Sequence, residues 1–412
     1  MKNLATLIQE LCPEGVKFVK LGNVMDISRG ASPRPIQKYL TDDPSGVNWI
    51  KIGDVENNAK YITETKEKIT AEGALKSRLL HKGDFVLSNS MSFGRPYILA
   101  IEGCIHDGWI SMSNYQSVLL PDFLYHLLRS YNIQKYWKQK ASSGTVSNLN
   151  ADIVRKTEIP LPPLEVQTEI VRILDKFTSL EAELEAELDC RKRQYEYYRD
   201  KLLSFDNVGG QEVEWKKMSE VGTFIRGKRF VRTDIVEEGV PCIHYGDIYT
   251  YYGLTATKAK TCLKPEKAEK MKFASKNDVV IVGAGENNMD IGVGVAWLSD
   301  EKVAIHDACY IFKSKMNARF VSHYLRGSNY HLQIKKYVCE GKICSISSKS
   351  IGRSLIPVPS LQEQERIATI LDRFESLTTS LQSGLPAEIA ARRQQYEHYR
   401  DKLLTFKRKG IA

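Results

Sequence analysis

The sequence predicts an α+β protein: two similar mixed α/β domains separated by two long antiparallel helices that form a coiled coil, with an internal pseudo-two-fold repeat. Three observations predict this fold class. The 412 residues repeat one module, each module ends in a narrow apolar stripe at helical spacing, and the remainder of each module mixes strand and helix patterns. We therefore expect domains at residues 1–160 and 207–357, with helical regions at 161–206 and 358–412.

The repeat is visible in short motifs that recur 197 residues apart. The sequence Ile159–Pro162, IPLP, returns as IPVP at Ile356–Pro359, and Arg29-Gly30 returns as Arg226-Gly227. The two helical ends match closely, with a shift of 201 near their C-terminal parts, whereas the globular parts match only in outline. This contrast indicates that the helices share one structural role and that the globular parts have diverged toward different targets.

The first helical region has no Gly or Pro across residues 165–203, so we expect one helix of about 58 Å. The second contains Gly384-Leu385-Pro386, which predicts a break between helices at about 362–382 and 387–404. Ordinary long core helices are the alternative, but a stripe this narrow needs a partner helix. The residues expected in the coiled coil or against a partner protein are Ile170, Ile173, Phe177, Leu184, Leu188, Tyr195, Tyr198, Ile367, Ile370, Phe374, Leu381, Tyr396 and Tyr399.

Charge separates the helices from the globular parts. Residues 165–203 carry 10 acidic and 7 basic side chains, and residues 362–404 carry 7 and 6, although the whole chain has a net charge of +9. The positive excess therefore lies in the globular parts, where a polyanion such as DNA would bind.

The segment Glu181–Leu188 contains the four-residue sequence EAEL twice in succession. One such unit adds about 6 Å of helix. The repeat has two interpretations: a spacer whose length changes by whole units, or an ordinary helix rich in Glu, Ala and Leu.

The globular parts alternate apolar runs with Gly-Asp or Asn-Asp turns, which is typical of a mixed α/β domain and not of a helix-turn-helix protein. Helices are expected at 121–137 and 318–337. Strands are expected at 47–52, 85–87, 240–245 and 279–282.

Several loops combine small, polar and basic residues, which are the types that contact base edges and phosphates. For most single residues of this kind a solvated turn is the commoner role, but Arg29 and Arg226 stand out because the same Arg-Gly recurs. The candidates for DNA binding are Arg29, Ser32, Arg34, Lys51, Asn89, Arg95, Ser143, Thr145, Asn148, Arg226, Lys228, Arg229, Arg232, Asn287, Lys342, Ser345 and Lys349.

The pair His106-Asp107 recurs as His306-Asp307, but no nucleophile motif accompanies either copy. We expect these pairs to serve hydrogen bonding or DNA contact and not catalysis. The sequence also lacks a P-loop, a dinucleotide fingerprint and an amino-methyltransferase tetrad, and its eight cysteines form no CxxC pair. We therefore predict no catalytic, cofactor or metal site in this chain, reduced thiols in the cytoplasm, and no membrane span.

Four helical segments resemble the conserved helical regions of specificity subunits of type I restriction–modification systems. They are Ile170–Phe177, Gln194–Phe205, Gly384–Ile389 and Gln395–Phe406, and the EAEL repeat is similar to one branch of that family. The segment from Leu21 to Pro33 is similar to the start of the family's target recognition domains.

The resemblance implies that residues 1–160 bind one half of a split, asymmetric site in double-stranded DNA and residues 207–357 bind the other. It also implies that the helices set the gap and bind two modification (methyltransferase) subunits, joined by restriction (translocase–nuclease) subunits. S-adenosylmethionine, ATP and magnesium would then belong to those partners. Only the second helical copy carries the Gly-Leu-Pro break, so the two copies need not be equivalent.

Two other classes of function remain open on the residues alone. One is a coiled-coil scaffold protein that binds DNA without sequence preference, which salt-dependent binding with no preferred site would favour. The other is a self-contained methyltransferase, against which the missing motifs argue.

Overall fold

The computed structural model describes residues 3–55, 59–89, 93–141, 148–205, 213–379 and 384–410. The chain divides into two compact units: unit 1 is Met1–Glu183 with Ala390–Ala412, and unit 2 is Leu184–Ile389. Helix α6 (Leu164–Ser204) contributes its first half to unit 1 and its second half to unit 2. Each unit therefore combines one globular domain with helices from both copies of the repeat.

Unit 1 contains two five-stranded sheets, in the orders β3-β6-β4-β10-β7 and β2-β11-β8-β9-β5. A further antiparallel pair, β1 and β12, precedes α6. The strands are β1 (Lys17–Lys20), β2 (Asp26–Arg29), β3 (Leu40–Thr41), β4 (Val47–Ile50), β5 (Tyr61–Ile62), β6 (Glu67–Ile69), β7 (Arg78–Leu80), β8 (Phe85–Ser88), β9 (Pro96–Leu99), β10 (Gly103–Ile105), β11 (Trp109–Ser113) and β12 (Glu158–Leu161). The helices are α1 (Leu4–Leu11), α2 (Ala71–Leu75), α3 (Pro121–Leu128), α4 (Tyr131–Ala141) and α5 (Ala151–Lys156).

Unit 2 repeats this plan with sheets in the orders β14-β24-β20-β22-β17 and β15-β18-β16-β23-β19. The larger strands are β14 (Gly222–Arg226), β16 (Val240–Ile243), β20 (Val279–Val282), β22 (Gly294–Trp297) and β24 (Cys309–Ser314). The shorter ones are β13 (Trp215–Lys217), β15 (Ile235–Val236), β17 (Thr255–Ala256), β18 (Thr261–Leu263), β19 (Phe273–Ala274), β21 (Ala284–Gly285), β23 (Val303–Ile305), β25 (Cys344–Ser345) and β26 (Leu355–Pro357). The helices are α7 (Met218–Val221), α8 (Tyr245–Thr250), α9 (Pro265–Ala268), α10 (Ala318–Tyr324), α11 (Ser328–Lys335) and α12 (Ser348–Gly352).

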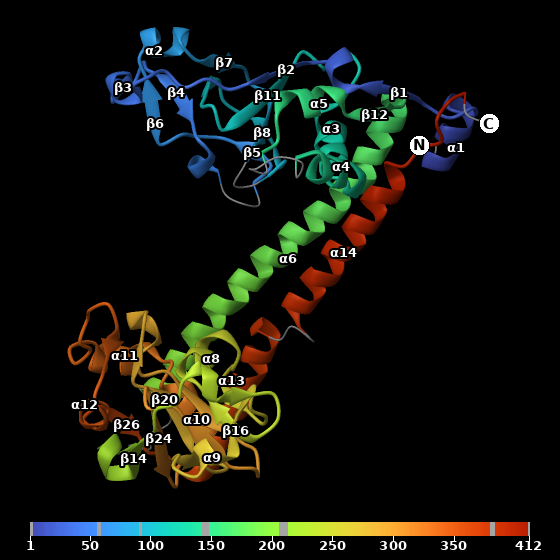
Figure 1. The fold of residues 1–412 in the computed structure, drawn as a ribbon. Coiled ribbons are helices and arrows are strands. Elements are labelled where there is room, and N and C mark those ends of the chain that lie inside the picture. The colour runs from blue at the N-terminus through green and yellow to red at the C-terminus, as the bar shows by residue number, and fades with distance from the viewer. Residues whose placement is uncertain are drawn as a thin grey trace. The chain divides into compact units, whose positions relative to one another are not determined.

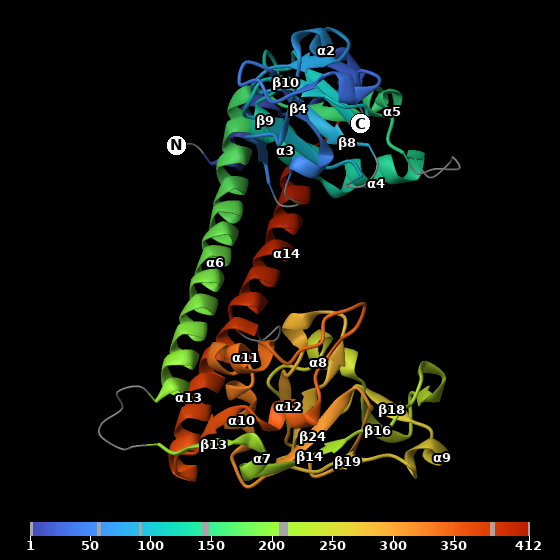
Figure 2. The same cartoon turned by 90° about the vertical axis from the view of Figure 1, so that its left-hand side faces the viewer.

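The long helices follow the sequence prediction closely. Helix α6 is unbroken, whereas the second copy divides into α13 (Leu361–Thr379) and α14 (Leu385–Leu403). The break has a backbone cause: Gly384 has φ +80°, and a Cβ there would lie 2.8 Å from the carbonyl oxygen of Leu377. Within unit 1, α6 and α14 lie side by side (Figures 1 and 2).

An aromatic pair contributes to the contact between the long helices in each unit. In unit 1 Phe177 stacks on Tyr399 with ring centroids 5.3 Å apart. In unit 2 Phe374 stacks on Tyr198 at 5.6 Å. In the repeat Phe177 corresponds to Phe374, with a shift of 197 residues, and Tyr198 corresponds to Tyr399, with a shift of 201. Each stacked pair therefore combines the phenylalanine of one helical copy with the tyrosine of the other.

Two helices predicted as continuous are in fact pairs of helices, which corrects the expectation for residues 121–137 and 318–337. A carboxylate from a long helix accepts a hydrogen bond from the backbone at the start of each second helix. Tyr131 N donates to Asp401 at 2.9 Å, and Ser328 N donates to Asp200 at 3.2 Å. Such capping satisfies an otherwise unpaired N–H and favours a helix start there.

Two predicted strands are also shorter than expected. The strand predicted at 47–52 ends at Ile50, and a 3₁₀ turn covers Ile52–Asp54. The strand predicted at 240–245 ends at Ile243, because α8 begins at Tyr245. Both strands therefore stop at the same point before Gly-Asp.

A buried histidine connects the globular domain of each unit to both of its long helices. In unit 1 His126 contacts Tyr396 through Nδ1 at 2.8 Å and Asp175 through Nε2 at 3.0 Å. We call these three residues the first histidine network. The second is His323 with Tyr195 at 3.1 Å and Asp372 at 2.8 Å.

These networks predict a dependence of stability on pH. Burial lowers the pKa of both His126 and His323, so below about pH 6.5 the unfolded chain binds protons that the folded chain does not. The free energy of unfolding should therefore fall as pH drops from 7.5 to 5.5. The histidines His106, His244, His306 and His331 act in the same direction, since burial lowers the pKa of each.

Urea denaturation at a series of pH values measures this fall. The lowered pKa values of Asp175 and Asp372 act mainly below about pH 4, outside this window. A variant with His126→Gln and His323→Gln should show a smaller fall than the parent chain. A double variant that loses as much free energy of unfolding between pH 7.5 and 5.5 as the parent chain would contradict the assignment.

Candidate nucleic-acid interface

The recurring Arg-Gly motif has the same structural role in both units. At the end of β2, Arg29 donates from Nε to the carbonyl oxygen of Asp107 at 2.9 Å. At the end of β14, Arg226 donates from Nε to the carbonyl oxygen of Asp307, also at 2.9 Å. Both arginines are exposed, but each is fixed to the loop that carries the His-Asp pair.

The glycine of each motif is required by a close approach of two backbones. A Cβ on Gly30 would lie 2.1 Å from the carbonyl oxygen of His106, and one on Gly227 would lie 2.2 Å from that of His306. No side chain fits at these distances, so glycine is needed at both positions.

The His-Asp pairs stabilise their own loops. Nδ1 of His106 accepts a hydrogen bond from Gly108 N at 2.7 Å, and Nδ1 of His306 accepts one from Ala308 N at 3.2 Å. Burial lowers the pKa of both imidazoles, which favours the neutral form that can accept these bonds. This geometry agrees with the hydrogen-bonding role expected from the sequence.

A pocket of about 680 Å³ in unit 1 brings four of the predicted residues together. Arg29, Lys51, Asn89 and Asn148 line it, beside His106. Lys66 also lines this pocket and was not predicted, because it belongs to a connecting segment with no repeated counterpart. The pocket thus combines ammonium, guanidinium and amide donors, the groups that bind phosphate oxygens and base edges.

Asp107 is the centre of the charged groups at this pocket. Ser32 Oγ donates to its Oδ1 at 2.9 Å, and the guanidinium groups of Arg34 and Arg29 lie 3.6 and 3.7 Å from its Oδ2. Burial acts to raise the pKa of Asp107, but the hydrogen bond from Ser32, a backbone hydrogen bond and the charge of Arg29 outweigh it, so the pKa is lowered. Three predicted residues thus converge on one carboxylate.

In unit 2 the predicted residues fall into two groups. Arg226, Lys228, Arg229 and Arg232 are exposed along the segment that leaves β14. The pairing of β21 with β25 brings together the two loops that carry the second group, which comprises Asn287, Lys342, Ser345 and Lys349.

Several predicted residues have a local structural role or lie elsewhere. Asn287 accepts a hydrogen bond from Met289 N at 3.1 Å, so its side-chain oxygen caps a turn. Arg95 directly precedes β9 and is partly buried. Ser143, Thr145 and Leu381 lie outside the described residues. Ile170 and Ile367 are fully buried in the cores that also contain the preceding domain, so they pack against that domain as well as against a helix.

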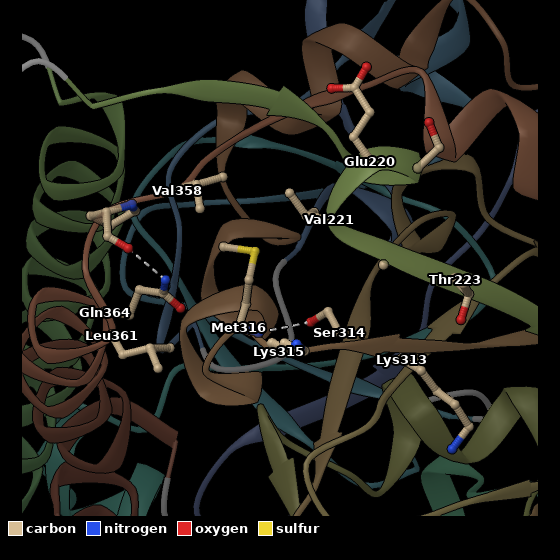
Figure 3. A pocket seen from close by; sticks show the side chains of 13 residues that line it. Glu220, Val221, Thr223, Lys313, Ser314, Lys315, Met316, Val358, Leu361 and Gln364 are labelled. Atoms are coloured by element: carbon tan, nitrogen blue, oxygen red, sulfur yellow. Dashed lines mark hydrogen bonds between the residues drawn. The ribbon is translucent and has the colours of Figure 1, made fainter.

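A second pocket, of about 770 Å³, lies in unit 2 between β14 and the start of α13 (Figure 3). Val221, Met316, Val358 and Leu361 give it a mainly apolar lining, with Lys313 at its edge. An apolar lining suits neither phosphate nor base edges, so this pocket is not part of the candidate interface.

The described residues include no group of three or more His, Cys, Asp or Glu side chains placed to hold a metal ion. Among the helices in the described ranges, none combines the length and apolar character that a membrane crossing needs.

The two units share one fold and one arrangement of the Arg-Gly and His-Asp segments. The family model described as "Type I restriction modification DNA specificity domain" matches residues 13–189 and again residues 211–391. The chain therefore belongs to the type I restriction–modification specificity subunits, as the sequence predicted.

The chain is also similar to known proteins that carry this family's name. A type I restriction enzyme specificity subunit of Escherichia coli is 38% identical over 266 residues, which cover 61% of this chain and 63% of that relative. A putative specificity subunit of Haemophilus influenzae is 29% identical over 98% of this chain and 100% of the relative. A structure solved in a study of complex assembly and conformational transition of the type I R-M system covers 97% of this chain and 99% of its own, with a TM-score of 0.66. Its 18% identity shows the shared fold alone.

Proposed function

We propose that this chain recognises a split, asymmetric site in double-stranded DNA, with the domain of unit 1 bound to one half-site and the domain of unit 2 to the other. One observation carries the proposal. Both domains hold the Arg-Gly and His-Asp segments with the same hydrogen bond from Arg29 or Arg226, yet they surround this frame with different side chains. One backbone frame that presents two sets of side chains suits two different half-sites.

The chemistry of DNA modification and cleavage would belong to partner subunits. Two modification (methyltransferase) subunits would bind the long helices, and restriction (translocase–nuclease) subunits would join the complex. S-adenosylmethionine, ATP and magnesium would bind to those partners, and this chain would act in the cytoplasm as a recognition subunit without catalytic activity. The support is the family, together with a sequence that contains no matching catalytic motif.

Footprinting of the chain assembled with its modification subunits tests the proposal. We expect two protected segments of DNA with an unspecified gap between them, and binding that weakens as salt rises, because lysine and arginine displace counterions. One continuous protected sequence would contradict a split site. Salt-dependent binding with no preferred sequence would instead support the scaffold alternative.

A further inference from the structure

We propose that one equivalent residue in each domain, Lys51 in unit 1 and His244 in unit 2, determines the base that the domain accepts at one position of its half-site. The inference rests on the proposed function and names the residues that give the two domains different specificities. Lys51 was a candidate for DNA binding on sequence grounds, whereas His244 was not.

The backbone places Lys51 and His244 at the same point of the fold. In unit 1 β4 runs parallel to β10 with Ile50 opposite Ile105, and in unit 2 β16 runs parallel to β23 with Ile243 opposite Ile305. Lys51 and His244 are the next residues after Ile50 and Ile243.

The hydrogen bonds around this point are also the same. The carbonyl oxygen of Ile50 accepts from His106 N at 3.4 Å, and that of Ile243 accepts from His306 N at 3.2 Å. One residue later, the carbonyl oxygen of Lys51 accepts from Asp54 N at 3.2 Å.

In unit 2 the carbonyl oxygen of His244 accepts from Asp247 N at 3.0 Å, which completes the match. The side chains of Lys51 and His244 therefore leave equivalent turns, and both turns lie beside a His-Asp loop.

Lys51 presents an ammonium group to the pocket of unit 1. Its Nζ lies 2.6 Å from Glu67 Oε1, and about a third of the side chain is exposed (34%). Arg29 and Asn89 line the same pocket. An ammonium group donates hydrogen bonds and accepts none, so it favours guanine, whose O6 and N7 are both acceptors in the major groove.

His244 presents an imidazole ring at the equivalent position of unit 2. Its ring centroid lies 4.6 Å from that of His306 and 4.3 Å from that of Tyr245. Phe230 packs at a right angle on His306 at 4.8 Å, so aromatic rings surround the loop in unit 2. Nδ1 of His244 accepts from Gly246 N at 3.3 Å, and burial lowers the pKa of the imidazole.

A neutral imidazole whose Nδ1 accepts a hydrogen bond carries its proton on Nε2. His244 therefore offers one uncharged N–H and a ring face, whereas Lys51 offers three donors and a charge. The two domains should differ in base preference at this position because of these two side chains.

The recurring arginines, unlike Lys51 and His244, are the same residue in both domains. Arg29 and Arg226 make the same hydrogen bond to the same loop in both domains, so they are positioning residues that cannot by themselves distinguish the two half-sites. Their removal should weaken binding to the half-site of their own domain without changing its preferred bases.

Selection of bound duplexes from a randomised DNA library tests these assignments, with the full chain assembled with its modification subunits. Lys51→His should reduce binding to the parent first half-site by about tenfold or more and remove its preference for guanine at one position. His244→Lys should introduce a guanine preference into the second half-site alone. Lys51→Arg should retain the guanine, and Arg29→Ala should leave the selected first half-site unchanged at lower affinity.

Lys82→Ala is the matched control for loss of one positive charge from unit 1. Lys82 is exposed in the turn that precedes β8. The pocket residue Asn89 follows the other end of β8, so Lys82 lies at the end of the strand that is away from the pocket. This variant should select the parent sequence. If the parent chain selects a split site and Lys51→His selects the same bases with equal affinity, the inference is overturned. If the parent chain selects no split site, the proposed function itself fails.

Discussion

Replacement of Asp372 by alanine should lower the free energy of unfolding of unit 2 by about 2–3 kcal/mol. Asp372 Oδ1 accepts from Nε2 of His323 at 2.8 Å, and His323 is completely buried. Without the carboxylate, the imidazole keeps a buried N–H with no partner, and Arg319 also loses one of its two carboxylate partners. Urea denaturation of the full chain, followed by circular dichroism, measures the loss.

The repeat supplies controls for this prediction. Asp175→Ala removes the equivalent carboxylate from His126, so it should destabilise unit 1 by a similar amount and leave the unfolding of unit 2 unchanged. Asp300→Ala, also in unit 2, removes a carboxylate that is 89% exposed and should change the free energy of unfolding by less than about 0.5 kcal/mol. Equal effects of Asp372→Ala and Asp300→Ala would show that the second histidine network contributes nothing specific.

Deletion of Glu181–Leu184 from α6 should abolish methylation of the parent site and create a preference for a site whose gap is shorter by about two base pairs. Four residues account for about 6 Å of helix, and one base pair rises about 3.4 Å. The deletion leaves the pocket of unit 1 and the candidate side chains of both domains unchanged, so neither half-site sequence should change. Bound-duplex selection with the assembled complex measures the gap and the half-sites together.

A length-matched variant isolates the effect of length from the effect of side chains. Replacement of Glu181, Glu183 and Leu184 by alanine, with Ala182 already present, keeps α6 continuous, because alanine has the highest helix propensity. It removes the ion pair between Glu181 and Arg393, which at this partly exposed position is worth at most about 1 kcal/mol. This variant should retain the parent gap. A gap that changes in the alanine variant, or half-sites that change in the deletion, would argue against a spacer.

Much of the fold followed from local patterns in the sequence. The absence of Gly and Pro across residues 165–203 predicted the unbroken α6, and Gly384-Leu385-Pro386 predicted the break between α13 and α14. These features depend on backbone conformation within a few residues, which sequence shows directly.

The features that sequence did not predict depend on contacts between distant residues. The ends of α3 and α10 follow from hydrogen bonds that Asp401 and Asp200 make with the start of the next helix. The histidine networks join residues 270 positions apart in unit 1 and 128 in unit 2. No local periodicity reveals such partners.

The DNA-binding role of the candidate residues stays a prediction, although the structure brings four of them together at one pocket. The recurrence of Arg29 and Arg226 predicts DNA contact, and their matching hydrogen bonds to Asp107 and Asp307 give them a structural role as well. His244 was missed because a single histidine in an apolar strand carries no motif. The sequence nevertheless aligns His244 with Lys51, because each residue stands two positions before a Gly-Asp pair.

We infer that the two domains, which share one backbone frame, bind two different stretches of DNA. Mapping of methylated bases across the genome of the host, with and without this chain, tests it most directly. We predict a single asymmetric motif made of two specified segments around a gap of fixed length, whose methylation disappears when the chain is removed. A continuous motif, or a methylation pattern that persists without the chain, would contradict the claim.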